Sequence, residues 1–208
     1  MYISSRPNWR KGVPVTGRTV TRRMPREQRR EQLVDAATTA FARTGGYPRT
    51  SLEEIAAEAG VTAAIIYRHF TSKAELYQAA IDRACLRLFH TATDADGELT
   101  DLSLARMLTW ASAEPAAFRL LFRYARLEPE FSHDIEQLWS SMVGAARPHV
   151  AAIASSPAWA DWGAHLNTTV VIESILVWLD SGSPDPAEAA ARLALTVTGI
   201  EQAVRAPS

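Results

Sequence analysis

Cysteine is almost absent from this sequence, since Cys85 is the single one among 208 residues. One cysteine excludes an intramolecular disulfide and leaves no cysteine cluster for a structural metal, which is typical of proteins from a reducing compartment. Long apolar runs are missing as well. No segment approaches the roughly 20 apolar residues that span a bilayer, and no apolar stretch follows the basic N-terminus. We therefore expect a cytoplasmic protein without a membrane anchor.

The short motifs of the common enzyme classes are also missing. The sequence has no glycine-rich phosphate loop, no His-Glu-x-x-His and no nucleophile elbow, and its five histidines are scattered. We therefore predict that the protein is not an enzyme and has no catalytic site, no metal and no cofactor. An uncharacterised helical enzyme is the remote alternative.

Alternation with a strand period never lasts long, and apolar residues recur instead at helical spacing. We predict an all-α protein with an N-terminal three-helix head, a connecting helix and a C-terminal helical bundle. The expected divisions are a basic arm (1–24), a head with its connecting helix (25–90) and a C-terminal helical domain (91–208). Proline, glycine and capping residues predict bundle helices at about 99–112, 115–127, 132–155, 159–181 and 186–205.

Residues 50–70 predict two short helices joined by a tight turn. Ser51 and Glu54 have the spacing of a capping box, and the same spacing recurs one residue earlier. Gly60 follows where a helix end needs a left-handed backbone, and Thr62 caps the next helix. Two helices with such a turn form a helix-turn-helix, whose second helix docks in the DNA major groove. A chance amphipathic pair is the alternative.

Flanking motifs make this segment more specific. In chain order they are Ala40-Phe41, Gly45-Gly46, Ser51-Leu-Glu-Glu-Ile-Ala56, Ala59-Gly-Val-Thr62, Ile66-Tyr-Arg-His-Phe70 and Ser72-Lys73. With these motifs in register, residues 26–90 resemble the DNA-binding domain of the tetracycline-repressor (TetR) family of transcriptional regulators. Several motifs at family spacing are far more specific than one helix-turn-helix alone.

The resemblance implies two kinds of DNA contact. Phosphate contacts fall to Thr50, Ser51, Thr62, Tyr67, His69 and Lys73, and base-edge contacts fall to Ala63, Ala64 and Arg68. Many relatives have lysine, arginine or proline and then glycine where this sequence has Ala63 and Ala64. Small apolar side chains touch a thymine methyl group but form no bidentate hydrogen bond, so we expect few polar base contacts from this helix.

The N-terminal residues are a second candidate for DNA contact, because nine of the first thirty are basic and one, Glu27, is acidic. Residues up to about Met24 have no helical or strand period, so we expect a mobile arm. Arginines on such an arm reach the adjacent minor groove in homeodomains, and we assign that role to Arg22, Arg23 and Arg26. A solvated tail and a misassigned start are the alternatives.

The net charge of −1 hides an asymmetry between the two ends of the chain. Up to residue 90 there are fifteen basic and eight acidic residues, a balance of +7; from residue 91 there are seven basic and fifteen acidic, a balance of −8. Such segregation suits a protein that binds a polyanion by one end only.

The last two predicted helices indicate how the chain assembles. The helix at 159–181 is apolar on nearly every face, so it must be buried on more than one side. The helix at 186–205 places small residues beside its apolar ones. We predict a homodimer built from two copies of each helix, as the resemblance also implies, with a monomeric bundle as the alternative. The expected interface residues are Ile172, Ile175, Leu179, Leu193, Val197, Ile200 and Val204.

Bulky side chains of the bundle are candidates for lining an effector pocket, because pockets combine an apolar lining with a few placed polar groups. The lining candidates are Trp110, Phe118, Phe122, Trp139, Met142 and His165, and the candidate polar anchors are Arg119, Arg123, Arg126, His133 and Asn167. Core filling is the alternative for the aromatic residues, and a solvated surface is the alternative for the arginines.

Together these features predict a homodimeric TetR-like regulator, a repressor that a small-molecule effector releases from a palindromic operator in double-stranded DNA. An architectural helix-turn-helix factor that ignores small molecules is the alternative. A regulator should occupy a few operators, whereas an architectural factor should cover many sites.

Overall fold

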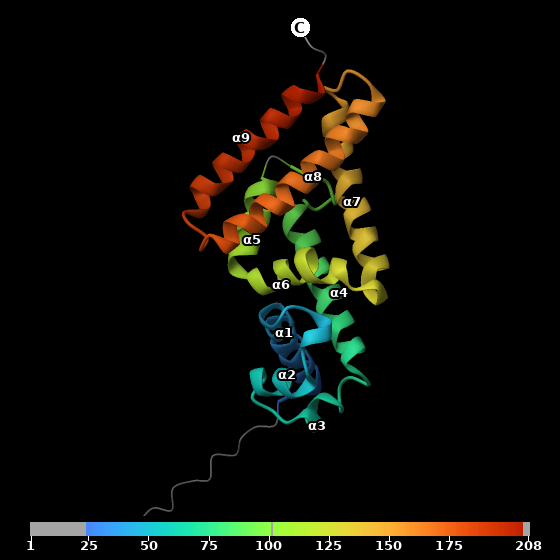
Figure 1. Ribbon diagram of the computed structural model, residues 1–208, viewed down its shortest axis with the longest axis vertical. Helices are drawn as coiled ribbons and strands as arrows, with labels where there is room; N and C mark the ends of the chain where they lie inside the picture. Colours follow the sequence, from blue (N-terminus) through green and yellow to red (C-terminus); the bar gives the residue numbers. More distant parts are fainter. Residues whose placement is uncertain (1–23, 101, 206–208) are drawn as a thin grey trace, which may run out of the picture.

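The computed structural model describes residues 24–100 and 102–205 (Figure 1). Within them every regular element is helical, apart from one isolated β-bridge between Thr93 and Leu99. The molecule is elongated, with α1, α2 and α3 at one end and α5 to α9 gathered at the other (Figure 1). The predicted all-α class with an N-terminal head and a C-terminal bundle is confirmed.

The head consists of α1 (Arg26–Thr44), a 3-10 turn η1 (Tyr47–Arg49), α2 (Leu52–Glu58) and α3 (Ala63–Ile66). The connecting helix α4 (Lys73–Ala92) begins in the head and runs into the bundle, here called the body. At the end of α1, Gly45 has a φ of 98°, a left-handed conformation that side chains disfavour, and its amide donates to the Phe41 carbonyl. The chain can therefore leave α1 sharply and enter η1.

Among the described residues, the body contains five α-helices that begin at or near the predicted places. They are α5 (Ser103–Ala113), α6 (Pro115–Arg119), α7 (Ser132–Ala151), α8 (Pro157–Asp180) and α9 (Pro186–Val204). The helix expected from 99 starts later, because residues 93–99 form a turn closed by the β-bridge. The helix expected to reach 155 ends at Ala151, and α8 follows after a Ser156 cap whose hydroxyl accepts from the Trp159 amide.

The stretch 115–127 is less regular than predicted. After α6 it widens into a π turn, η2 (Leu120–Tyr124), and then tightens into 3-10 turns, η3 (Ala125–Leu127) and η4 (Pro129–Phe131). Consecutive residues of a regular α-helix point in different directions, yet Leu120, Leu121 and Phe122 are all buried. The wide turn therefore accommodates three neighbouring side chains in the core, where α6 and η2 pack against α1 and α4.

One apolar core runs through head and body. Leu33, Ala37, Ala40 and Phe41 line the buried stripe of α1 at helical spacing, and each is fully covered. The same core continues through α4 into α5, α6 and α8. In the part of the chain that the structure describes, no helix is both long and apolar enough to cross a membrane.

Most of the α8 and α9 residues expected at a dimer interface are buried within one protomer. Side chains expected at a dimer interface, Ile172, Ile175, Leu179, Leu193, Ile200 and Val204, are at most 8% exposed in the single chain, and Val197 is partly buried against the same core. In the structure α8 packs against α7 and α9 of its own chain, so these residues serve the protomer's core, and their place at a dimer interface stays a prediction.

Candidate nucleic-acid interface

The first helix of the helix-turn-helix, α2, begins at the predicted capping box. The Ser51 hydroxyl accepts from the Glu54 amide at 3.2 Å, and the Glu54 carboxylate accepts from the Ser51 amide at 2.8 Å. These bonds satisfy backbone donors that the first helical turn leaves free. They also hold the pKa of Glu54 below its ordinary value, because the ionised carboxylate is the better acceptor.

The turn between α2 and α3 forms as predicted at Gly60, which has a φ of +64°. The Gly60 amide donates to the Ala57 carbonyl and the Val61 amide to the Ala56 carbonyl, which closes the end of α2. Thr62 then precedes α3, but its hydroxyl caps no amide, so it stays free at the surface. The helix expected to end near Phe70 ends at Ile66, and tight turns carry the chain on to Phe70.

The residues of α3 divide between core and surface. Ile66 is buried and Ala63 packs partly against the core, whereas Thr62, Ala64 and Arg68 are exposed. Tyr67 is 61% exposed, an unusual position for a large aromatic side chain that has no internal partner. Among the predicted base-edge residues, Ala64 and Arg68 are therefore more accessible than the half-buried Ala63.

Basic side chains of α1 gather beside the end of α3. Burial first, and then the positive charges of Arg26, Arg29, Arg30 and Arg68, lower the pKa of His69 below 6.5. This shift favours the neutral imidazole, whose buried Nδ1 has no hydrogen-bond partner among the described residues. This surface concentrates positive charge on arginine side chains, which stay charged at any physiological pH.

Two of the predicted phosphate contacts have other partners in the structure. Thr50 is 2% exposed, and its hydroxyl donates to the Gly46 carbonyl at 2.8 Å. The Lys73 ammonium donates to the carbonyls of Tyr47 at 2.8 Å and Thr50 at 3.0 Å. The sequence did not predict the two carbonyl partners of Lys73, because both lie more than twenty residues from it along the chain. Arg22 and Arg23, assigned to the minor groove, lie outside the described residues, while Arg26 opens α1.

The residues proposed for an effector pocket differ in their burial. Trp110, Phe118 and Phe122 are buried in the core, Trp139 and Met142 are partly buried on α7, and His165 is exposed on α8. A hollow of about 440 Å³ lies instead between α5, α8 and α9, where Leu108, Trp178, Asp185, Arg192 and Leu193 contribute to its walls. None of the six proposed lining residues borders it.

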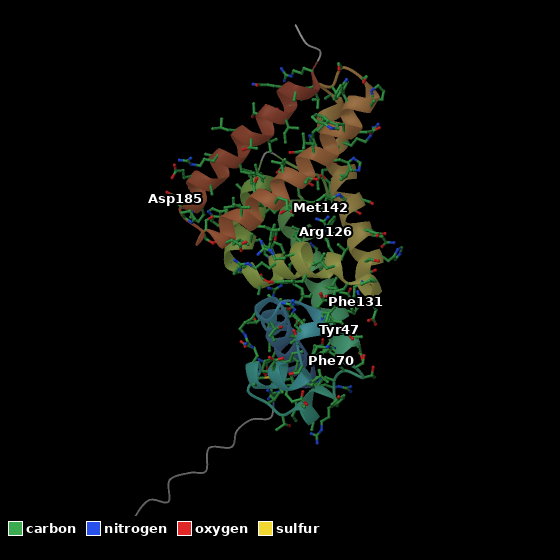
Figure 2. All side chains as sticks on the ribbon, viewed as in Figure 1. Tyr47, Phe70, Arg126, Phe131, Met142 and Asp185 are labelled. Atoms are coloured by element: carbon green, nitrogen blue, oxygen red, sulfur yellow. The ribbon has the colours of Figure 1, made fainter. Side chains whose placement is uncertain are left out.

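The arginines proposed as polar anchors pair with acids of α8. Arg119 and Arg123 both bind the Asp180 carboxylate, and the Arg126 guanidinium stacks 5.0 Å from the Trp139 ring centroid (Figure 2 labels Arg126). Across residues 24–100 and 102–205, no group of three or more histidine, cysteine or acidic side chains is placed to hold a metal ion.

Comparison with known proteins matches the segment that contains the helix-turn-helix. Residues 33–80 match the family model "Bacterial regulatory proteins, tetR family". The chain is 43% identical over 70 residues to the HTH-type transcriptional activator FasR of Mycolicibacterium smegmatis. This match covers 34% of this chain and 32% of FasR. It is 39% identical over 84 residues to the HTH-type transcriptional regulator TtgR of Pseudomonas putida. This second match covers 39% of this chain and 40% of TtgR. The chain thus matches less than half the length of each relative.

Solved structures share the fold over most of the chain. A TetR-like transcriptional regulator from a Rhodococcus species aligns with a TM-score of 0.69 and 22% identity, over 82% of this chain and 94% of that one. A transcriptional regulator from Aquifex aeolicus aligns with a TM-score of 0.66 and 16% identity, over 84% of this chain and 99% of that one. At this identity the likeness establishes the arrangement of helices.

Proposed function

We propose that this chain, whose residues 33–80 match the TetR family model, is a TetR-family transcriptional regulator that binds double-stranded DNA through its helix-turn-helix. The observation that carries the proposal is the exposed side of α3, where Arg68 joins the arginines of the first α1 turns around His69. Such a surface suits duplex DNA, because each phosphate that it neutralises releases condensed counterions.

In the proposed complex, α3 enters the major groove and its exposed residues meet the DNA. Ala63, Ala64 and Arg68 face the base edges, with the two alanines favouring thymine methyl groups and Arg68 supplying the polar contact. The phosphate contacts fall to Ser51, Thr62, Tyr67 and His69. The exposed hydroxyls of Thr62 and Tyr67 support this assignment, whereas the buried Thr50 is left out. Arg22, Arg23 and Arg26 supply the minor-groove contact of the arm.

The protein acts as a homodimer in this proposal, because two recognition helices about one DNA turn apart read a palindromic operator. The exposed apolar side chains of α8 and α9 are the ones free to meet a second copy. Trp162 is 45% exposed, Val177 62% and Leu195 73%, so each offers apolar surface that a second copy would cover. They take the place of the buried residues first expected at the interface.

A small-molecule effector that alters operator binding completes the proposed function. We keep the predicted repressor role, although the relative FasR is named a transcriptional activator. An effector shifts the balance between two states of the dimer only through a difference in its affinity for them. The continuous core from body to head supplies the physical link that such a shift requires.

Binding of the full chain to duplex DNA tests the proposal. A duplex selected by the protein from a random pool should bind at least about a hundredfold more tightly than unselected duplex, and affinity should fall steeply with salt. Arg68→Met should relax the base preference at one position of each half-site. Arg192→Met removes an exposed charge on α9 and should change neither property. A wild-type chain that ignores duplex DNA at low salt would overturn the proposal.

Genome-wide occupancy separates the regulator from the architectural alternative. A regulator occupies a small set of sites and loses them when its effector accumulates, because the effector shifts the dimer to the other state. Coverage of many unrelated sites, unchanged by growth conditions, would favour the architectural factor.

A further inference from the structure

Lys73, at the start of α4, reaches back to the segment that precedes α2. Its ammonium donates to the carbonyls of Tyr47, the first residue of η1, and Thr50, the residue that follows η1. It also lies 4.3 Å from the centroid of the Tyr47 ring. Hydrogen bonds from a charged donor are about twice as strong as neutral ones. Thr50 is followed directly by Ser51, the cap of α2. Lys73 therefore ties α4 to the point where the helix-turn-helix begins.

The body holds the other side of Tyr47. The Tyr47 ring centroid lies 5.2 Å from that of Phe131, in η4, and 5.1 Å from that of Tyr77, in α4, and the latter two rings are 4.6 Å apart. Tyr77 and Phe131 are almost completely buried. Figure 2 shows Tyr47 and Phe131 next to each other where the body meets the head. We call Tyr47, Lys73, Tyr77 and Phe131 the junction cluster.

The turn before Tyr47 is held by the body as well. A side chain added at Gly46 would place its Cβ 3.4 Å from the Tyr124 Cβ and from a carboxylate oxygen of Glu128. The body thus touches the chain on both sides of residue 47. Packed cores and interfaces move between discrete arrangements and do not deform continuously, so a shift of η4 is passed to η1.

These contacts decide between two roles for the Lys73 ammonium. A phosphate ligand has to present its charge to the DNA, but Lys73 uses two of its three donors on backbone carbonyls beside an aromatic ring. Reaching a phosphate would break both bonds and leave two carbonyl oxygens without their donor. The geometry favours a residue that orders the protein.

We propose that Lys73 is a positioning residue of the DNA-binding head, and that Phe131 is the contact through which the body sets the orientation of α2 and α3. The proposal rests on the proposed DNA binding for its effect on affinity. The effect of Lys73 and Phe131 on how well α2 and α3 are ordered does not require DNA and is measurable in the free protein.

Salt titration separates positioning from phosphate contact. Lys73→Met keeps the aliphatic stem and removes the donors, so it should weaken binding to the selected duplex at least about tenfold with an unchanged slope of log affinity against log salt. Arg26→Met removes an exposed cation at the proposed interface and should flatten the slope by about 0.9 for each phosphate that the variant no longer neutralises. A Lys73→Met slope that falls like that of Arg26→Met would overturn the proposal.

Hydrogen exchange of the free protein tests the positioning without DNA. Lys73→Met and Phe131→Leu should each raise amide exchange of residues 51–67 at least about tenfold, because local opening of α2 and α3 becomes easier. Ile175→Val shortens a buried side chain of α8 and should leave this segment unchanged. Unchanged exchange in Phe131→Leu would refute the connection to the body.

The two readouts keep the proposals distinguishable. If the wild-type chain binds no duplex, the proposed function fails while hydrogen exchange still decides the role of Lys73. If Lys73→Met folds too poorly to compare, Lys73→Gln takes its place. Its side chain retains a shorter, neutral donor, so amide exchange of residues 51–67 should still rise above that of the wild type. No rise in that folded variant would count against the proposal.

Discussion

Asp180, the last residue of α8, binds the guanidinium of Arg123 through both of its carboxylate oxygens, at 3.1 and 2.6 Å. Arg119, one turn earlier, donates to the same carboxylate at 3.2 Å. The hydrogen bond from Arg123, followed by that from Arg119, holds the pKa of Asp180 below its ordinary value of 3.8. This paired arrangement joins the π turn, which packs on the head, to the helix proposed for dimer contact.

Replacing Asp180 with asparagine should therefore destabilise the fold. Two arginines would face each other without a counter-charge, but Asp180 is 43% exposed and solvent screens the interaction. We expect a loss of about 0.5–1 kcal/mol, measured as a lower urea midpoint. Glu136→Gln removes an exposed acid of α7 and should have almost no effect. A midpoint equal to that of the wild type would show that the pair contributes nothing.

Acid should weaken the start of α2 through Glu54. Its pKa is lowered in the folded state, chiefly by the Ser51 amide and then by the Ser51 hydroxyl. A lowered folded pKa gives stability that is present above the ordinary value of 4.5 and is lost as the pH falls below it. Glu54→Gln should therefore lose less stability than the wild type between about pH 6 and pH 3 in urea unfolding. Parallel losses in the two proteins would contradict this expectation.

Two helical glycines should respond in opposite ways to an added methyl group. A Cβ at Gly163 would lie 2.6 Å from Val204 Cγ1 and 2.8 Å from Val150 Cγ1, whereas a Cβ at Gly144 meets nothing within 4 Å. Gly163→Ala should cost about 1–3 kcal/mol by overpacking where α7, α8 and α9 meet. Gly144→Ala should stabilise α7 by about 0.5–1 kcal/mol, because alanine suits a helix interior better. Thermal unfolding of both variants would measure the signs.

An acidic residue on the proposed dimer face should separate the subunits. Leu195→Asp places a charge on α9 where the wild-type side chain is 73% exposed, so the single chain should remain folded while dimer formation weakens at least about a hundredfold. Leu127→Asp makes the same change at a side chain of η3 that is 75% exposed. Sedimentation should show a dimer for Leu127→Asp and a monomer for Leu195→Asp. Dimers in both would exclude this face.

The sequence predicted the elements whose signals are local. The capping box and the left-handed Gly60 depend on residues within a few positions of one another, and each forms as predicted. The apolar pattern predicted burial of α8 on more than one side, and it did not reveal that Trp162 and Val177 stay exposed. Local hydrogen bonding and periodicity are therefore enough for the head and for the fold class.

The sequence did not predict which partner covers a buried side chain. Periodicity shows that Ile172 and Ile200 need burial, but both the chain's own helices and a second copy would provide it. Similarly, a lysine after the Ser72 cap is compatible with a phosphate or with carbonyls that are distant in sequence. Contacts between residues far apart along the chain decide these cases, and only the folded structure supplies them.

The brevity of α3 has a consequence for regulation in the cell. Four residues form a single turn, and an isolated helix shorter than about 12 residues is marginal in water. The recognition turn is therefore ordered only while its neighbours are. If α3 reads an operator as proposed, modest warming, or a cavity in α1 far from any nucleotide, would erode that selection before the molecule as a whole melts, so temperature-sensitive alleles should be common in this domain.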